Sequence, residues 1–170
     1  MEFLNAIKDR IPDYAKDIRL NLDAVVARSS LPPEDALGVA LAAAFASKSA
    51  PLIEAFRANT PAAEANAALT AAALMGMNNV WYPYVEMAAD EELKTVRPEL
   101  RMNAYASSGG VEKKKFEAYA LAASIVGKCH FCVQSHYALL KKEGDTVQQL
   151  RDIGRIAAVV NAAAQVLIAG

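Results

Sequence analysis

The stretch from Val111 to Gly144 reads VEKKKFEAYALAASIVGKCHFCVQSHYALLKKEG. It predicts two helices, one from Val111 to Val126 that can end at Gly127, and one from about Cys129 to Lys142. Alanine is far above its average share in the whole chain, and runs of β-branched residues are scarce. Helix propensity therefore favours an all-α fold, with this helix pair as its most informative part.

Further helices are expected on both sides of this pair. Asp13 is a candidate N-cap, and apolar residues then recur on one helical face at Tyr14, Ile18, Leu22, Val25 and Val26. Proline near a helix start predicts three more helices, which begin at Pro32-Pro33 (through Ala46), Pro51 and Thr60-Pro61. Near the C-terminus, a capping box predicts the start of the last helix, at Asp145-Thr146-Val147-Gln148.

The two halves of the chain look alike, which suggests an internal duplication. Ala40-Leu41-Ala42-Ala43 matches Ala120-Leu121-Ala122-Ala123, and Lys48 matches Lys128 at the same offset. We therefore expect one domain over 1-170, with a degenerate N-terminal half at about 1-85 and a catalytic half at about 95-170, joined by a charged segment from Asp90 to Pro98. In this alignment the places of Cys129, Cys132 and His136 are taken by Ser49, Leu52 and Phe56.

Composition limits the classes of partner and compartment. The net charge of −1 offers no excess of positive charge that would attract nucleic acid or an anionic membrane. The most apolar window, from Ala36 to Ser47, is too short to span a bilayer. The N-terminus has neither a basic nor an apolar leader segment, so we expect a cytoplasmic protein. In that compartment a C-x-x-C pair is more often catalytic or metal-binding than a structural disulfide.

Both cysteines and both histidines of the chain lie within the eight residues from Cys129 to His136. Phe131 aligns with Pro51, and proline favours the first turn of a helix, so the C-x-x-C should straddle a helix start. Cys132 would then lie inside the first turn, where unpaired N–H groups stabilise a thiolate, which makes it the expected nucleophile and Cys129 its resolving partner. His136 follows Cys132 by one helical turn, and Glu117 can fold back from the preceding helix.

Other interpretations of these residues stay open. Glu117 alone could be a solvated helix residue, and His130 could be an exposed loop histidine instead of part of the pocket. Zinc would need about four ligands, and this chain offers no second cysteine pair. The alternatives to a redox enzyme are thus a zinc-binding structural oligomer and, with the same chemistry, a thiol–disulfide reductase or adaptor. The unusual string from Met75 to Tyr82 is interpreted as a helix end with core aromatics, and packing or a subunit interface is favoured there over direct chemistry.

Glu117, Cys129, Cys132 and His136 together form the pattern E-x11-C-x-x-C-x-x-x-H. This pattern resembles that of the AhpD-like alkylhydroperoxidases, a group within the carboxymuconolactone decarboxylase superfamily. Three further strings resemble the same group, so that the resemblance covers nearly the whole chain: Pro12 to Ile18, Met75 to Val80 and Arg97 to Asn103.

The resemblance implies an all-helical subunit with duplicated halves, assembled as a homotrimer. It implies a peroxidase that reduces organic hydroperoxides and regenerates a partner peroxiredoxin, the C subunit of alkyl hydroperoxide reductase. Electrons would come from dihydrolipoamide on a lipoylated acyltransferase of a 2-oxoacid dehydrogenase complex, with no bound cofactor or metal.

The resemblance also implies a role for each site residue. Cys132 would be the peroxidatic thiol that becomes a sulfenic acid, and Cys129 would give a proton and then close the disulfide. Glu117 and His136 would be the proton relay. One position departs from the pattern, because well-known members carry a histidine where this chain has Phe131, and His130 cannot be assumed to replace it. We therefore expect the departure to affect the rate more than the reaction class.

Overall fold

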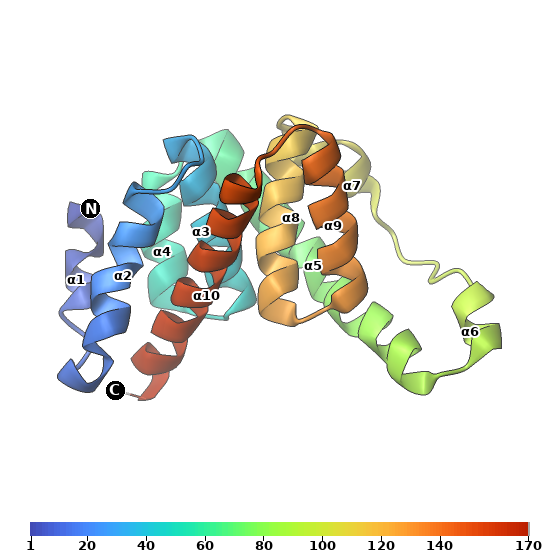
Figure 1. Cartoon of the computed structure of the whole chain (residues 1–170), viewed down its shortest axis with the longest axis horizontal. Helices are drawn as coiled ribbons and strands as arrows, with labels where there is room; N and C mark the ends of the chain where they lie inside the picture. The colour runs from blue at the N-terminus through green and yellow to red at the C-terminus, as the bar shows by residue number, and fades with distance from the viewer. Residues whose placement is uncertain (170) are drawn as a thin grey trace.

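The computed structural model describes residues 1–169, and within them it is all-helical, with no strand (Figure 1). This confirms the expected all-α class. The α-helices are α1 (Asn5–Lys8), α2 (Lys16–Ala27), α3 (Pro33–Ala46), α4 (Ala50–Asn59), α5 (Ala62–Ala88), α6 (Glu91–Thr95), α7 (Asn103–Ala106), α8 (Lys113–Gly127), α9 (His130–Lys142) and α10 (Val147–Ala169). Three short 3₁₀ turns complete the order: η1 (Glu2–Leu4), η2 (Asp13–Ala15) and η3 (Ser108–Gly110).

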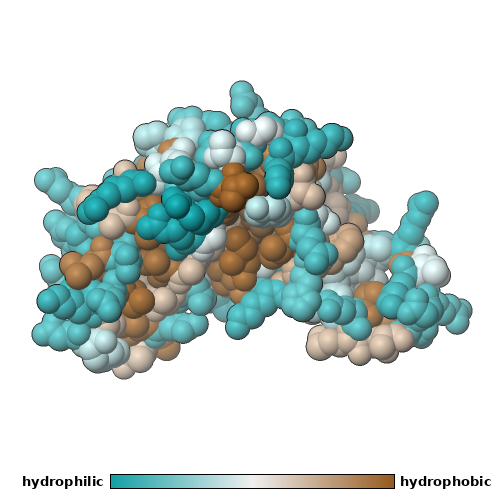
Figure 2. Space-filling view, viewed as in Figure 1, coloured by the Kyte–Doolittle hydropathy of each residue, from teal (hydrophilic) through white to brown (hydrophobic). Residues whose placement is uncertain are grey.

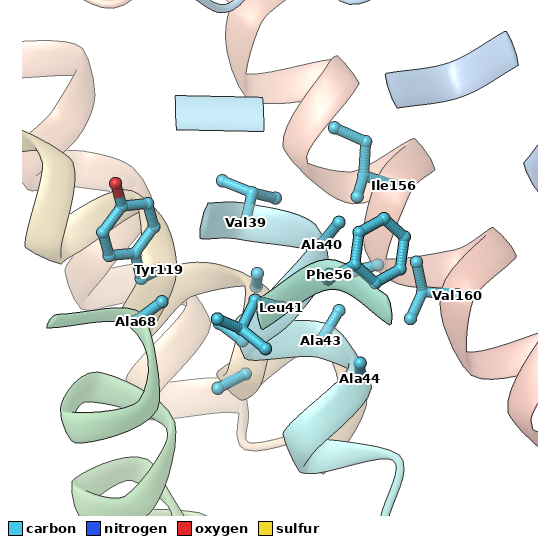
Figure 3. Close-up of a cluster of buried hydrophobic side chains, with 14 of the residues drawn as sticks. Val39, Ala40, Leu41, Ala43, Ala44, Phe56, Ala68, Tyr119, Ile156 and Val160 are labelled. Carbon is cyan, nitrogen blue, oxygen red and sulfur yellow. The ribbon is translucent and has the colours of Figure 1, made fainter. Parts of the chain in front are cut away.

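The core is built around α3, which packs against α5, α8 and α10. Eight of its fourteen residues are buried, and five of these are alanine. Small side chains let the neighbouring helices approach closely, and the larger side chains of the partner helices fill the space between them (Figure 3). At Gly38 the packing leaves no room for a side chain, because a Cβ atom there would lie 2.4 Å from a ring carbon of Tyr119.

The chain makes the same turn twice, at the offset that the sequence match indicates. Lys48 between α3 and α4 has φ 59°, and Lys128 between α8 and α9 has φ 55°. The next residue donates its N–H to a carbonyl five residues back in both turns, Ser49 to Ala44 at 3.2 Å and Cys129 to Ser124 at 3.3 Å. The turn is thus repeated in the backbone, while duplication of the whole halves stays a prediction.

Two expected helix starts are shifted. Asp13 is not an N-cap, because it lies within η2, and α2 begins only at Lys16; Tyr14 is 75% exposed and does not share the buried face of α2. The last capping box is formed by Thr146 and Gln149, each accepting the other's backbone N–H, at 2.9 and 3.2 Å. Asp145 is instead buried and ion-paired with Lys114.

The interpretation of Met75 to Tyr82 as a helix end with core aromatics is wrong. This string lies in the middle of α5, which continues through Pro83 to Ala88. The C-terminal part of α5, α6 and the segment up to α7 extend away from the helical body as an arm (Figure 1). Large apolar side chains on this arm are exposed to solvent: Val80, Tyr84, Met87, Val96 and Leu100. Figure 2 shows that hydrophobic residues also reach the surface along the middle of the face in view.

By length and hydropathy α10 could cross a membrane, but in this fold it is a core helix. It packs against α2, α3 and α8, and its apolar side chains Ile153, Ile156 and Val160 are fully buried. Its charged residue Asp152 is 1% exposed and accepts hydrogen bonds from the N–H and hydroxyl of Ser30, both at 2.8 Å, and from Arg151 and Arg155. Burial alone would raise the pKa of Asp152, but these bonds outweigh it and lower the pKa to about 2.

Asp152→Asn is expected to lower the free energy of unfolding by about 2 kcal/mol at pH 7, since hydrogen bonds to a charged group are lost. The pKa of Asp152 is lower in the folded protein than in the unfolded chain, where it is near 3.8, so the ionised carboxylate stabilises the fold at pH values above 3.8. This stabilisation is lost as the pH falls through about 2, the pKa in the folded protein. Urea denaturation at several pH values checks this, because the two proteins should converge between pH 4 and 2. The exposed Asp17→Asn is the control, with a change within about 0.5 kcal/mol.

Candidate functional site

The C-x-x-C motif straddles the start of α9, as the sequence predicts. Cys129 is the N-cap residue, and its Sγ accepts the backbone N–H of Cys132 at 3.3 Å. Cys132 lies in the first turn of the helix, and the two cysteines form a disulfide with a Cα–Cα distance of 5.3 Å. Unpaired N–H groups and the helix dipole act on both sulfur atoms here, since the N-cap sulfur is itself a hydrogen-bond acceptor.

The turn before the motif is held by α5. Asn79 donates its side-chain N–H to the carbonyl of Ala123 at 3.1 Å, near the end of α8. The last residue of α8 is Gly127, and a Cβ atom there would lie 2.1 Å from Asn79 Nδ2. Glycine is therefore required for this close approach, which sets where α9 begins relative to α5.

Glu117 and His136 meet in the interior below the motif. Glu117 is 1% exposed and His136 5%, and Oε2 of the carboxylate lies 2.6 Å from Nδ1 of the imidazole. The solvated interpretation of Glu117 is thus wrong, and the expected pairing of the two residues is confirmed. The other carboxylate oxygen accepts the hydroxyl of Tyr105 at 2.5 Å.

The protonation of this cluster follows from its contacts. Burial by itself raises the pKa of Glu117, but hydrogen bonds from His136 and Tyr105 outweigh burial, so its pKa lies below the ordinary value. Burial and the neighbouring carboxylate raise the pKa of the Tyr105 hydroxyl. Glu117 is therefore ionised near neutral pH, and Tyr105 stays a neutral hydrogen-bond donor.

A pocket of about 250 Å³ opens beside the disulfide. Its lining residues come from α5, α7, α9 and the segment before α7: Asn78, Tyr82, Met102, Tyr105, Phe131, Cys132, Ser135 and His136. Both cysteines are buried, Cys132 with 2% and Cys129 with 0% of its surface exposed, but only Cys132 lines the pocket. The sulfur of Cys129 lies 3.8 Å from the carbonyl oxygen of Asn78. A small molecule in the pocket therefore meets Cys132 and His136 and does not reach Cys129.

Three residues next to the site are not predicted from the sequence. Tyr105 comes from the four-residue helix α7, and no spacing rule connects it with Glu117. Met75 and Asn78 belong to the string from Met75 to Tyr82, for which the sequence favours packing or a subunit interface over direct chemistry. Met75 is fully buried, with its sulfur 3.2 Å from His136 Nε2, and Asn78 lines the pocket. The position of Met75 and Asn78 in that unusual string was the only sequence signal that pointed to a role at the site.

Phe131 and His130 lie on the outer side of the motif. Phe131 is 51% exposed and stacks on Tyr82, with ring centroids 4.3 Å apart. The side chain of His130 is 75% exposed, and its Nδ1 lies 3.1 Å from Glu86 on α5. His130 does not line the pocket of Cys132, so the structure does not bring it together with Glu117 and His136. In residues 1–169, no group of three or more His, Cys, Asp and Glu side chains is arranged to hold a metal ion.

Comparison with known proteins agrees with these features. The model of the carboxymuconolactone decarboxylase family matches residues 91–169, which include α8, α9 and α10. The chain is 42% identical over 168 residues to a protein of Rhodospirillum centenum named alkyl hydroperoxide reductase AhpD, covering 96% of this chain and 90% of that protein. Proteins of the same name from Maricaulis maris (40% identical, 98% of both chains) and Coxiella burnetii (39% identical, 97% of both chains) are similar over their whole lengths.

Similarity of this extent goes beyond the motif, because it includes the N-terminal half of the chain, which carries no cysteine or histidine. The chain therefore belongs to the carboxymuconolactone decarboxylase superfamily, in its AhpD-like branch.

Proposed function

We propose that this protein is an antioxidant thiol peroxidase that reduces organic hydroperoxides through Cys132 and Cys129. The observation that carries the proposal is a disulfide with one sulfur on the wall of a mostly apolar pocket, beside a buried carboxylate–imidazole pair. The relatives named alkyl hydroperoxide reductase support the same class of oxidoreductase. An alkyl chain fits the lining of Tyr82, Met102 and Phe131, while the peroxide group meets Cys132.

The reaction balances in three steps. The Cys132 thiolate attacks the outer oxygen of the hydroperoxide, the O–O bond breaks, and the leaving alkoxide takes a proton to become an alcohol. Cys132 is now a sulfenic acid, and the thiol of Cys129 attacks its sulfur, which forms the disulfide and releases water. A dithiol donor then reduces the disulfide by thiol–disulfide exchange and is itself oxidised.

His136 and Glu117 supply the proton transfers. Imidazole takes the thiol proton of Cys132 as the thiolate forms and returns it to the alkoxide as the O–O bond breaks. Glu117 accepts the Nδ1 hydrogen bond and stabilises the charged imidazolium, and Tyr105 holds the second carboxylate oxygen in place. Burial of the pair keeps this charge interaction strong.

The electron donor and partners follow from the family resemblance. We propose dihydrolipoamide as the donor, presented by a lipoylated acyltransferase, and a peroxiredoxin C subunit as the partner that is regenerated. The protein would work in the cytoplasm with no bound cofactor. We also propose a homotrimer, which the exposed apolar side chains of the arm support, since Val80, Tyr84, Met87, Val96 and Leu100 would be covered by other copies.

The test is a peroxide consumption assay with an alkyl hydroperoxide as substrate and reduced lipoamide as donor. Catalytic consumption that requires both reagents, together with formation of the Cys129–Cys132 disulfide detected by mass spectrometry, supports the proposal. Rapid oxidation of reduced lipoamide by a disulfide acceptor with no peroxide consumption would overturn it in favour of a thiol–disulfide reductase.

Phe131→His is expected to raise the peroxide turnover number at saturating donor, because a histidine beside Cys132 adds a second group for proton delivery. The gain should be largest near pH 6.5, where an unperturbed imidazole titrates. Turnover measured against peroxide and dihydrolipoamide separates two roles of the aromatic ring. Phe131→Leu is the control, because it removes the stack on Tyr82 without adding a proton carrier. A higher donor KM in both variants with an unchanged peroxide rate would show that Phe131 docks the donor.

A further inference from the structure

Both ring nitrogens of His136 have a close partner. Nδ1 lies 2.6 Å from Glu117 Oε2, and Nε2 lies 3.2 Å from the Sδ atom of Met75. Met75 comes from α5 and is fully buried, so the ring of His136 on α9 is held between α8 on one side and α5 on the other. The side chain of Asn78 also faces this sulfur, with Nδ2 at 3.9 Å.

The bond at Nδ1 fixes one proton on the ring. Glu117 accepts the hydroxyl of Tyr105 on its other oxygen, and its lowered pKa keeps it ionised near neutral pH. An ionised carboxylate only accepts hydrogen bonds, so Nδ1 carries the hydrogen in its bond with Glu117. A neutral His136 would then have a lone pair, and no hydrogen, on Nε2.

The contact at Nε2 decides whether the ring is neutral. A thioether sulfur has no hydrogen to donate and is a weak acceptor. If Nε2 were bare, two lone-pair-bearing atoms would face each other at 3.2 Å. If Nε2 carries a hydrogen, the same distance is an N–H···S hydrogen bond. Both nitrogens of an imidazole donate only when the ring is the imidazolium cation.

We infer that Met75 is a positioning residue of the relay, whose sulfur accepts Nε2–H and holds His136 as an imidazolium paired with the Glu117 carboxylate while the disulfide is closed. The nearby groups agree with a single positive charge, since Tyr105 is neutral and the disulfide carries no charge. Lys113 acts on the same carboxylate from the start of α8 without a hydrogen bond to His136. A buried imidazolium is tolerated here because its charge is paired.

The inference rests on the proposed function for its catalytic meaning. The imidazole that has given its proton to the alkoxide takes up another proton from solvent once the disulfide has closed. A donor thiolate attacks the sulfur of Cys132, the S–S bond breaks, and Cys129 leaves as a thiolate. The second thiolate of the donor then attacks the donor sulfur in this mixed disulfide, which oxidises the donor and releases Cys132 as a thiolate that needs a proton. An imidazolium that lines the same pocket as Cys132 supplies it. A thioether is a weak acceptor, so it orients this proton without binding it tightly. An oxygen acceptor would bind the proton more tightly.

The test is ¹⁵N NMR of the oxidised protein at pH 7, and it needs no peroxidase activity. The chain has only two histidines, so His130→Gln identifies the signals of His136. Both ring nitrogens of His136 are expected to carry hydrogen in the wild type. In Met75→Leu, which keeps the volume but removes the acceptor, Nε2 should be unprotonated at the same pH. Met75→Gln offers a carbonyl oxygen instead and should restore the doubly protonated ring.

Met77→Leu is the matched control, because it makes the same change on an exposed side chain of the same helix and should leave the His136 signals unchanged. A wild-type His136 with a bare Nε2 would overturn the inference, as would a Met75→Leu protein whose ring stays doubly protonated. If Met75→Leu fails to fold cooperatively, Met75→Ile removes the same acceptor at similar volume, and its His136 signals decide the question in the same way. Failure of the peroxidase assay with an imidazolium present would instead count against the proposed function alone.

Discussion

Cys132→Ser is expected to abolish hydroperoxide reduction, with a loss of at least about 10³-fold that leaves only the uncatalysed rate. A serine hydroxyl does not ionise near neutral pH, and the thiolate is the species that attacks the O–O bond. Cys129→Ser should behave differently. Its Cys132 can still attack one peroxide molecule, but no neighbouring thiol resolves the sulfenic acid, so consumption should stop after about one equivalent in the absence of an external thiol.

Single-turnover measurements distinguish the two cysteines. Reduced Cys129→Ser protein should give a burst of alcohol product and a sulfenic acid that a dimedone reagent traps at Cys132. Reduced Cys132→Ser protein should give neither. The assignment follows from the pocket, because Cys132 lines it and the fully buried Cys129 does not. A burst in Cys132→Ser, with the trapped residue at Cys129, would reverse the two roles.

Glu117→Gln and His136→Gln are each expected to slow peroxide turnover by roughly 10²–10⁴-fold, the usual contribution of positioned acid–base groups. Glutamine at 117 keeps the volume of a side chain that is 1% exposed, but it cannot stabilise an imidazolium. Because the two residues act through one hydrogen bond, the double variant should lose little more than the poorer single variant.

The comparison must be made on proteins with an unchanged helical circular dichroism spectrum and a cooperative thermal transition, because both side chains are buried. Ser135→Ala serves as a reference for a small change elsewhere on the pocket wall. Single-variant turnover within about twofold of the wild type would remove Glu117 and His136 from the mechanism. Fully multiplicative losses in the double variant would show that they act independently.

The sequence by itself determined the helical class and the local geometry of the motif. Alanine-rich segments and prolines at helix starts predicted most of the helices, since propensity and capping act over a few residues. The alignment of Phe131 with Pro51 placed Cys129 outside the first turn of a helix and Cys132 inside it, and α9 begins at His130 as this requires. The spacing from Cys132 to His136 put both on one helical face for the same local reason.

Other features were decided by the tertiary structure. Burial of Glu117, its pairing with His136 and the hydroxyl of Tyr105 depend on how α8 packs against α9 and α7, and no local pattern encodes the distance between two helices. Met75 reached His136 from α5, sixty-one residues away in the chain, because α5 continues past the point where a helix end was expected. Local sequence sets backbone conformation within a few turns, whereas the surroundings of a buried charge are set by whichever distant helices close over it.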